Sequence, residues 1–306
     1  MLPNDSNWKN LAIIILAFNE EKHIARCINS IKDISKEVYV IDSFSTDSTV
    51  EISKSLGAYV LQNEFINQAK QMNWALNNCN IRSKWIMRLD ADEYVLPELA
   101  LEISSKLCTL EDSISGIYLK RRVYFLNKWI KYGGIYPIYF LRIFRNGHAL
   151  SEDRWMDEHI KLIKGRSISF ENDFVDENLN SISWWIQRQN NYANREMIVM
   201  VLDKYCTEGR NLLNSRFFGK VDERKRWFKN IYNVFPRFIR PFFLFFYNYV
   251  LRGGFRSGYP GLIRFFYLSL WYRFLVDSKL YELELRSKKN YDKMKEIIKV
   301  ELGYEI

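Results

Sequence analysis

Three carboxylates stand together in the stretch RLDADEYV, where Asp90, Asp92 and Glu93 follow the apolar run 85–87. Alternate side chains of an extended segment point the same way, so Asp90 and Asp92 can aim at one point while Ala91 turns aside. Two converging oxygens without a nearby His or Cys suit a hard cation such as Mg²⁺ or Mn²⁺, which commonly completes its shell with waters and substrate phosphates. The alternative is a solvated turn, or a cap for the helix that follows.

Short apolar runs alternate with helical stretches over the first hundred residues. Strands are predicted at 11–18, 37–42, 58–61 and 84–90, and helices at 19–32, 45–57 and 67–79. Ser45 or Asp47 is expected to cap the second helix, and Gly57 to end it. Strands that alternate with helices predict an α/β fold with a parallel sheet covered on both faces.

Candidate site residues, most of them polar, lie at the ends of three of these strands. They are Phe18, Asn19 and Glu20 after the first strand, Asp42 and the residues to Asp47 after the second, and Asp90 to Glu93 after the fourth. Parallel sheets bind ligands beyond the carboxyl ends of their strands, so these residues predict one polar cleft. Neither GxGxxG nor GxxxxGK[ST] follows any of the strands, which argues against a dinucleotide site and against a P-loop.

Composition restricts the class of protein. The 306 residues are 48% apolar and 26% charged, as in a globular protein, and the formal charge of +9 favours an anionic partner. The four cysteines form no CxxC, so neither a zinc site nor a disulfide framework is indicated. The N-terminal apolar run is too short for a signal peptide, and we expect a cytoplasmic protein.

Four segments carry a family resemblance. They are LAIIILAFNEEKHIARCINSI, VYVIDSFSTDSTVEISKSLGAYV, QAKQMNWAL and WIMRLDADEYV, and in this order they resemble the opening of family 2 glycosyltransferases. These are inverting nucleotide-sugar enzymes of GT-A fold, which implies a Rossmann-like, mixed and mainly parallel sheet flanked by helices. RWMDEHI, NLNSISWWIQRQNNYANRE and GLIRFFYLSLWYRFLVDSKLYE further resemble the branch that builds bacterial lipopolysaccharide cores, O-antigens and exopolysaccharides.

The resemblance implies roles for the strand-end residues. Asp42 would accept hydrogen bonds from the uracil of a UDP-sugar. The base pocket would be lined by Ala17, Phe18 and Asn19, with Glu20 at its rim. Asp90 and Asp92 match the DxD motif of the family, with Asp92 the direct ligand of Mn²⁺ or Mg²⁺ and Asp90 nearer the ribose or the sugar. Donor contacts are also implied for Lys70 and Asn73. Phe44 stands where the commoner form of the motif has glycine.

The reaction also needs a base for the acceptor hydroxyl, and SEDRWMDEHIKL supplies candidates after the apolar strand 139–145. In this acid-rich segment, which also contains Asp153, the family pattern aligns best with Glu158 as the base, and Asp157 is the alternative. His159 is either a third metal ligand, a contact to the diphosphate, or a structural residue. Trp155 either stacks on a sugar face or belongs to the core.

The chain changes character after residue 175. Residues 173–205 are predicted to form a long helix whose Trp184, Trp185, Tyr192 and Met197 pack on the catalytic core. Residues 210–240 hold nine Lys or Arg against two acids, and sixteen of the forty residues 235–274 are aromatic. A membrane span needs about 20 apolar residues, and arginines interrupt this region. Helices in the headgroup interface of an anionic membrane are therefore expected, the alternative being a cover for the core or a dimer contact.

These observations together predict a catalytic domain over 1–175, with a donor half at 10–100 and an acceptor half at 101–175, and a helical membrane-associating region over 176–306. The expected enzyme moves glucose or galactose from a UDP-sugar to a polyprenyl-diphosphate-linked or lipid A-linked oligosaccharide, at the inner face of the cytoplasmic membrane. Nucleic acid is not an expected partner, although a basic and aromatic nucleic-acid-binding protein is one alternative. A catalytically silent scaffold of the same fold is the other.

Overall fold

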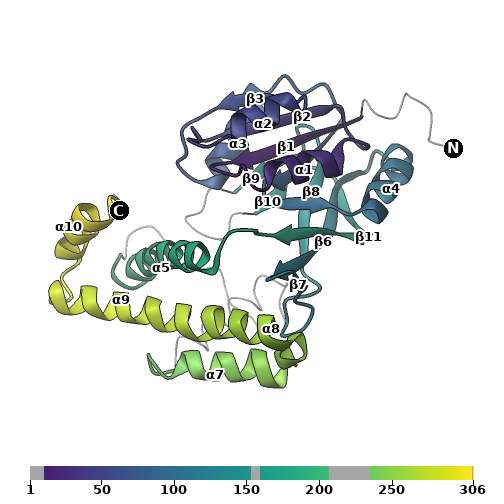
Figure 1. Cartoon of the computed structure of the whole chain (residues 1–306). Helices are drawn as coiled ribbons and strands as arrows, with labels where there is room; N and C mark the ends of the chain where they lie inside the picture. Colours follow the sequence, from purple (N-terminus) through teal and green to yellow (C-terminus); the bar gives the residue numbers. More distant parts are fainter. Residues whose placement is uncertain (1–9, 153–158, 207–234, 305) are drawn as a thin grey trace. The chain divides into compact units, whose positions relative to one another are not determined.

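The computed structural model describes residues 10–152, 159–206, 235–304 and 306. The chain divides into two compact units, residues 1–180 and residues 181–306. The first unit is built on a sheet and the second consists of helices, as Figure 1 shows.

Four parallel strands form one half of the sheet. They are β1 (Leu11–Ala17), β2 (Glu37–Asp42), β3 (Tyr59–Gln62) and β4 (Trp85–Asp90), in the order β3-β2-β1-β4. Each lies within one residue of its predicted bounds. Ala17 pairs with Asp42, and Leu16 pairs with Asp90. This register brings the carboxyl ends of β1, β2 and β4 to one edge of the sheet.

The other half of the sheet is mixed. It comprises β8 (Tyr139–Arg145), which is antiparallel to β4, then β6 (Ile114–Phe125), β11 (Arg166–Glu177) and β5 (Glu93–Val95), with β7 (Lys128–Trp129) paired to β6. A separate two-stranded sheet joins β9 (Ala149–Ser151) to β10 (Ile160–Leu162). The predicted mixed α/β fold class is confirmed.

One predicted helix is wrong at its start. Residues 173–177 are the end of β11, which lies between β6 and β5. Phe174 and Val175 are fully buried there, and pairing with two neighbouring strands outweighs the local helical pattern. Helix α5 (Ile182–Tyr205) begins only after Ser181, whose side chain accepts a hydrogen bond from the Trp184 amide at 3.3 Å. The predicted boundary after residue 175 thus falls inside β11.

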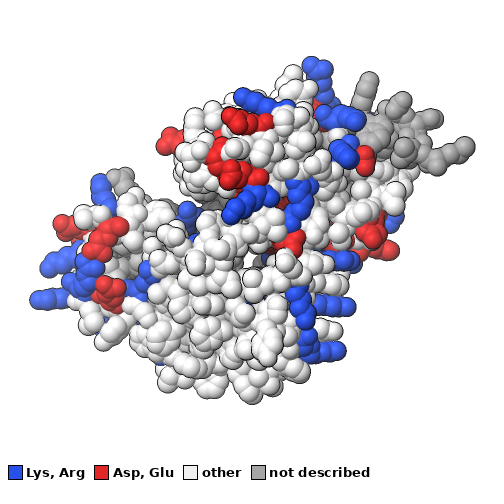
Figure 2. Space-filling model, viewed as in Figure 1, with Lys and Arg blue, Asp and Glu red and all other residues white. Residues whose placement is uncertain are grey.

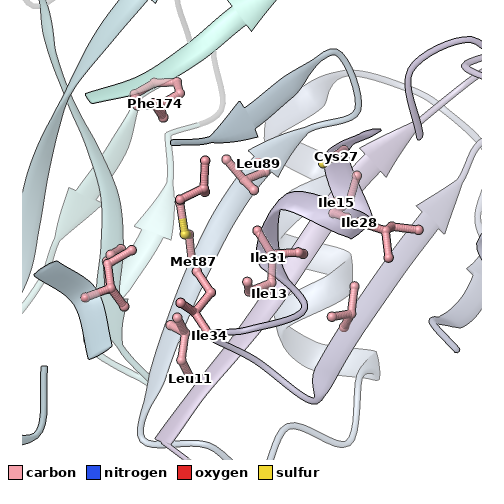
Figure 3. Close-up of a cluster of buried hydrophobic side chains, with 14 of the residues drawn as sticks. Leu11, Ile13, Ile15, Cys27, Ile28, Ile31, Ile34, Met87, Leu89 and Phe174 are labelled. Atoms are coloured by element: carbon pink, nitrogen blue, oxygen red, sulfur yellow. The ribbon is translucent and has the colours of Figure 1, made fainter. Parts of the chain in front are cut away.

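Helices cover both faces of the parallel half of the sheet. Alternate residues of β1 enter two separate clusters, Ile13 and Ile15 on one face and Ile14 on the other. The first cluster contains the buried side of α1 (Ile24–Ile31) and of α4 (Pro97–Lys106), and Figure 3 shows part of it. The second contains residues of α3 (Gln68–Asn78). The 3₁₀ turn η2 (Leu107–Thr109) follows α4.

The turn before α2 (Thr49–Ser55) differs slightly from the prediction. The cap position is Ser48, yet the Asp47 carboxylate accepts the Thr49 amide at 3.0 Å. Asp47 therefore supplies the expected capping bond from one position earlier. Gly57, with φ of +84°, ends this segment as predicted.

The second unit has its own core. Its further elements are α7 (Arg240–Phe246), the π-helical η3 (Tyr247–Leu251), the 3₁₀ turn η4 (Gly254–Ser257), α8 (Gly258–Phe265), the π-helical η5 (Phe266–Trp271), α9 (Tyr272–Arg286) and α10 (Tyr291–Leu302). Met197 of α5 is buried among side chains of α9 and α10, and the ring of Trp185 meets that of Tyr267 edge-on. Among the described residues, no helix is both long and apolar enough to cross a membrane.

Candidate active site

Two turns at the carboxyl edge of the sheet are joined by hydrogen bonds. The Asn19 amide donates to Ser45 Oγ at 2.8 Å, and Asn19 Oδ1 accepts from the Thr46 amide at 2.8 Å. The Glu20 amide donates to Thr49 Oγ1 at 2.7 Å. Asn19 adopts a left-handed φ of 55°, which its short polar side chain tolerates better than most. The turn after β1 is thus held in place by the turn after β2.

Asp42 is the centre of this arrangement. It has no exposed area, and its carboxylate accepts the Ser45 amide at 3.0 Å, the Ser45 hydroxyl, and Gln62 Nε2 at 3.0 Å. A uracil contact at Asp42 would therefore have to share the carboxylate with these donors or displace one of them.

Two aromatic side chains flank the turns and face solvent. Phe18 is 56% exposed and Phe44 is 54% exposed. Phe44 has a φ of +61°, so the turn keeps the left-handed conformation that a glycine at this position would favour. Phe44 thus holds a backbone conformation that a glycine adopts at lower cost.

The DxD motif has the alternation that the sequence predicts. Ala91 is buried in the core, whereas Asp90 and Asp92 are half-buried. Asp90 Oδ1 accepts from Arg88 Nη2 at 3.1 Å, and Asp90 Oδ2 lies 3.7 Å from Arg142 Nη2. Burial by itself would raise the pKa of Asp90, but these two guanidinium groups outweigh burial and hold that pKa below its ordinary value. Asp90 is therefore an ionised carboxylate between two arginines.

Asp92 is tied to the end of β11. Its carboxylate accepts Asn178 Nδ2 at 3.2 Å, and its carbonyl accepts the Glu177 amide at 3.2 Å and Arg26 Nη2 at 3.3 Å. Asn178 is a site neighbour that sequence reasoning missed, because residues 173–205 were assigned to one helix. The strand-to-helix boundary places it beside the DxD motif instead.

Glu93 has a role that the sequence did not indicate. It is 2% exposed, accepts the Asp90 amide at 2.9 Å, and forms an ion pair with Arg142. Burial raises the pKa of Glu93, the charges of Asp90 and Asp176 raise it further, and Arg142 opposes them. Glu93 thus supports the DxD backbone rather than merely favouring the helix that follows. The only sequence signal for Arg142 was a charge inside the apolar strand YFLRIFR.

The remaining predicted donor residues lie in different surroundings. Both ends of the Asn73 amide bond the backbone of Ser151, at 2.8 and 2.9 Å, so Asn73 fixes β9. Lys70 is exposed. Glu20 Oε2 lies 2.5 Å from Nδ1 of the buried His23, whose Nε2 accepts the Leu179 amide at 2.8 Å. The donor contacts of Lys70, Asn73 and Glu20 stay predictions.

The predicted base segment is only partly described. Asp153, Trp155, Asp157 and Glu158 lie outside the described residues, so the structure does not test their roles. His159 is described and exposed, and its carbonyl accepts the Glu152 amide at 3.0 Å.

The described residues form no complete metal site by themselves. They contain no group of three or more His, Cys, Asp or Glu side chains placed to hold a metal ion. Asp90 lies beside the guanidinium groups of Arg88 and Arg142, whereas Asp92 is partly exposed and accepts Asn178 Nδ2 at its Oδ2. A cation here would fit Asp92 together with ligands from the substrate, as hard cations commonly bind.

Comparison with known proteins decides the family. Residues 12–156 match the model of glycosyl transferase family 2. The first unit carries a glycosyl transferase family 2 domain. The match covers the four parallel strands, the turns after β1 and β2, and the DxD motif described above. The predicted family is confirmed, and a transferase is the class of enzyme that it supports.

Relatives of the family 2 domain are glycosyltransferases. An uncharacterized glycosyltransferase of Rickettsia typhi is 42% identical over 95 residues, which cover 31% of this chain and 32% of the relative. The lipopolysaccharide core biosynthesis glycosyltransferase LpsC of Rhizobium meliloti is 29% identical over 124 residues, 38% of this chain and 43% of the relative. The chain thus matches less than half the length of these relatives.

Solved structures include the glucosyl-3-phosphoglycerate synthase of Mycobacterium tuberculosis in complex with Mn²⁺, uridine diphosphate and glucosyl-3-phosphoglycerate. The aligned parts are 21% identical in sequence and cover 38% of this chain and 44% of the synthase chain, with a TM-score of 0.31.

Proposed function

We propose that this protein is an inverting glycosyltransferase that moves a hexose, glucose or galactose, from a UDP-sugar to an oligosaccharide acceptor. One observation carries the proposal. The turns after β1 and β2 and the Asp90-Ala91-Asp92 sequence after β4 meet at one edge of the parallel strands, inside the segment that matches the family. α/β sheets bind their ligands at this edge.

The base of the donor is proposed to lie on the joined turns. Ala17, Phe18 and Asn19 would line its pocket, and Glu20 would lie at the rim. The exposed ring of Phe18 supports a stacking contact. Asp42 would accept a hydrogen bond from uracil in exchange for one of its present donors. Outside these turns, Lys70, which is exposed, and Asn73 would contact the donor.

A divalent cation, Mn²⁺ or Mg²⁺, is proposed at Asp92, with His159 as a candidate further ligand. A cation held there would stabilise the charge that develops on the leaving diphosphate. Asp90, which Arg88 holds in place, would lie nearer the ribose or the sugar. In this division of roles, one carboxylate binds the cation and the other positions the donor.

Glu158 is proposed as the general base, with Asp157 as the alternative. The carboxylate takes the proton of the acceptor hydroxyl while the oxygen of that hydroxyl bonds to the anomeric carbon. The bond from that carbon to the diphosphate oxygen breaks on the opposite face, and the electron pair leaves with the diphosphate. This single displacement inverts the anomeric centre. Trp155 would stack on a sugar face.

The acceptor is proposed to be an oligosaccharide held on a polyprenyl diphosphate or on lipid A. The likeness to LpsC and the net charge of +9 support an anionic acceptor of this kind. We accordingly place the protein at the inner face of the cytoplasmic membrane, bound peripherally.

Thermal-shift screening of nucleotide sugars, with and without Mn²⁺, tests the donor class. A rise in melting temperature with UDP-glucose or UDP-galactose that requires the metal is expected, since ligand binding stabilises the folded state. GDP-sugars serve as the control. If no UDP-sugar shifts the melting temperature, the donor assignment is wrong.

Glu158→Gln tests the base. Turnover should fall about 10²- to 10⁴-fold while the thermal shift with the UDP-sugar persists, because the amide cannot take a proton. Asp157→Asn is the matched control and should retain most of the turnover. The opposite pattern would transfer the role to Asp157, and normal turnover in both variants would remove this segment from the mechanism.

A nucleic-acid-binding protein is the rival from another class, since basic and aromatic residues interleave in the second half of the chain. The carboxylates after β4 would repel phosphate in the absence of a metal. Salt-dependent binding of single-stranded RNA, without any response to UDP and metal, would favour this rival.

A further inference from the structure

The second unit exposes apolar side chains where a water-soluble helix exposes polar ones. In the helix formed by α7 and η3, the exposed large side chains are all apolar or aromatic, and Ile239 precedes them. They are Phe242, Phe243, Phe246, Tyr247, Val250 and Leu251. Their spacing of three to four residues places them on one side of the helix.

The polar residues of the same helix point inward instead. Arg240 is 4% exposed and forms a buried ion pair with Asp277 of α9. Asn248 Nδ2 donates to Ser269 Oγ at 3.1 Å, which joins the two π-helical segments. A surface helix in water has the reverse arrangement, with its polar groups outside.

A second stripe runs along η4 and the following helix of α8, η5 and α9, whose η5 segment packs against α7. Its exposed large apolar residues are Phe255, Tyr259, Leu262, Phe266 and Phe274. We call the two stripes together the aromatic face. Figure 2 shows the surface over α7 and α8 almost free of charge, with basic side chains at its edge.

The aromatic face is larger than a free surface usually is. A buried aromatic side chain covers about 150 to 250 Å², so the eleven large side chains of the two stripes, which are roughly half exposed on average, present on the order of 1,000 Å². The largest apolar patch on a typical monomer is about 300 to 600 Å². An area of this size indicates a binding surface.

Charge and hydrogen bonding favour a lipid surface over a protein. No acid occurs between residues 241 and 276, whereas this stretch holds Arg252, Arg256, Arg264 and Arg273. Arg273 is ion-paired with Glu196 of α5. Protein interfaces carry about one hydrogen bond per 100 to 200 Å², and the side chains of the aromatic face offer only tyrosine hydroxyls. Aromatic rings beside arginines are typical of the headgroup interface of anionic membranes.

The length of the first helix fits one leaflet and is too short for a span. The helix from Arg240 to Leu251 is about 18 Å long at 1.5 Å per residue, well short of the roughly 30 Å of a hydrocarbon core. We propose that the aromatic face inserts into the headgroup region of an anionic membrane. This deepens the proposed function, because it would hold the enzyme where a lipid-linked acceptor is found.

Flotation of the full chain with vesicles tests the proposal. The wild type should float with vesicles of phosphatidylcholine mixed with phosphatidylglycerol, and less with phosphatidylcholine alone. The double substitution Phe242→Ser and Phe243→Ser should weaken binding by at least about tenfold, since two exposed rings are lost. Phe65→Ser with Ile66→Ser, two adjacent exposed residues of the first unit, is the matched control and should bind like wild type.

Charge and self-association are measured separately. Arg252→Gln should reduce the preference for anionic vesicles about fivefold, since each basic residue near such a surface contributes about 1 kcal/mol. Vesicle binding that is equal in wild type and in the Phe242, Phe243 variant would overturn the proposal. So would a wild type that ignores vesicles but forms dimers that this variant abolishes in light scattering. Vesicle binding needs no donor sugar. A failure of the membrane proposal is therefore distinguishable from a failure of the proposed donor, which the UDP-sugar thermal shift measures.

Discussion

Glu284 offers a direct test of what holds the second unit together. Its carboxylate is 5% exposed and accepts Lys204 Nζ at 2.8 Å, Tyr205 Oη at 2.8 Å and Arg237 Nη1 at 2.6 Å. These partners come from the end of α5 and from the segment before α7. Glu284→Gln keeps the shape of the side chain but removes the charge that all three partners bind.

The magnitude follows from the pKa of Glu284. Burial alone would raise this pKa, but the bonds from Arg237, Lys204 and Tyr205 outweigh burial and lower it from 4.5 to about 2. A carboxyl whose pKa is depressed in the folded state binds protons more weakly there than in the unfolded state. Its stabilisation is therefore complete above pH 4.5 and is lost as the pH falls toward 2. A shift of this size corresponds to about 3 kcal/mol at pH 7.

Urea unfolding followed by tryptophan fluorescence measures this contribution. At pH 7 the free energy of unfolding of Glu284→Gln should be about 3 kcal/mol below that of the wild type, and by pH 3 the difference should have shrunk to less than half. Glu282→Gln is the control, because Glu282 lies on the same helix with a side chain that is 67% exposed. A difference that stays constant from pH 7 to pH 3 would refute the reasoning.

Three further substitutions probe other features. Glu93→Ala should lower the free energy of unfolding by about 3 to 5 kcal/mol, because Arg142 loses its closest buried partner. The control Glu98→Ala, at an exposed position, should change this free energy little. Equal effects of the two substitutions would contradict the buried pair. Phe44→Gly should be about 1 kcal/mol more stable than Phe44→Ala in urea unfolding, since only glycine relieves the left-handed φ, and the reverse order would contradict that conformation. Gly254→Ala should lower the free energy of unfolding by about 1 to 3 kcal/mol in the same assay. The added Cβ would lie 2.7 Å from a phenylalanine ring and 2.8 Å from a backbone oxygen. Unchanged stability would disprove this close packing.

The parallel half of the sheet was predictable because its signals are local. EVYVID forms β2 with the expected bounds, and the glycine that ends the next helical segment was identified by residue type. Apolar periodicity and turn residues act within a few positions, so they survive in the sequence alone. The same local order sufficed to place Asn19, Asp42 and Asp90 at one edge of the sheet.

The mixed half of the sheet was harder because its pairings are distant. Residues 173–177 carry a helix-like pattern, yet they pair with β6 and β5, which lie far earlier in the chain. The side chain of Asn73 bonds the backbone of Ser151, 78 positions away, a contact that no local pattern reveals. Local propensity is a weak preference, and burial between two strands overrides it.

The sequence by itself determined the order of the strands and helices, the residues that follow each strand, and the family 2 pattern that they form. Only the tertiary structure decided which charges are buried as pairs, such as Glu93 with Arg142 and Arg240 with Asp277. It also decided that the helix after Arg240 turns its phenylalanines outward. Periodicity reveals which residues share a face, but which face meets the core depends on packing between segments far apart in the chain.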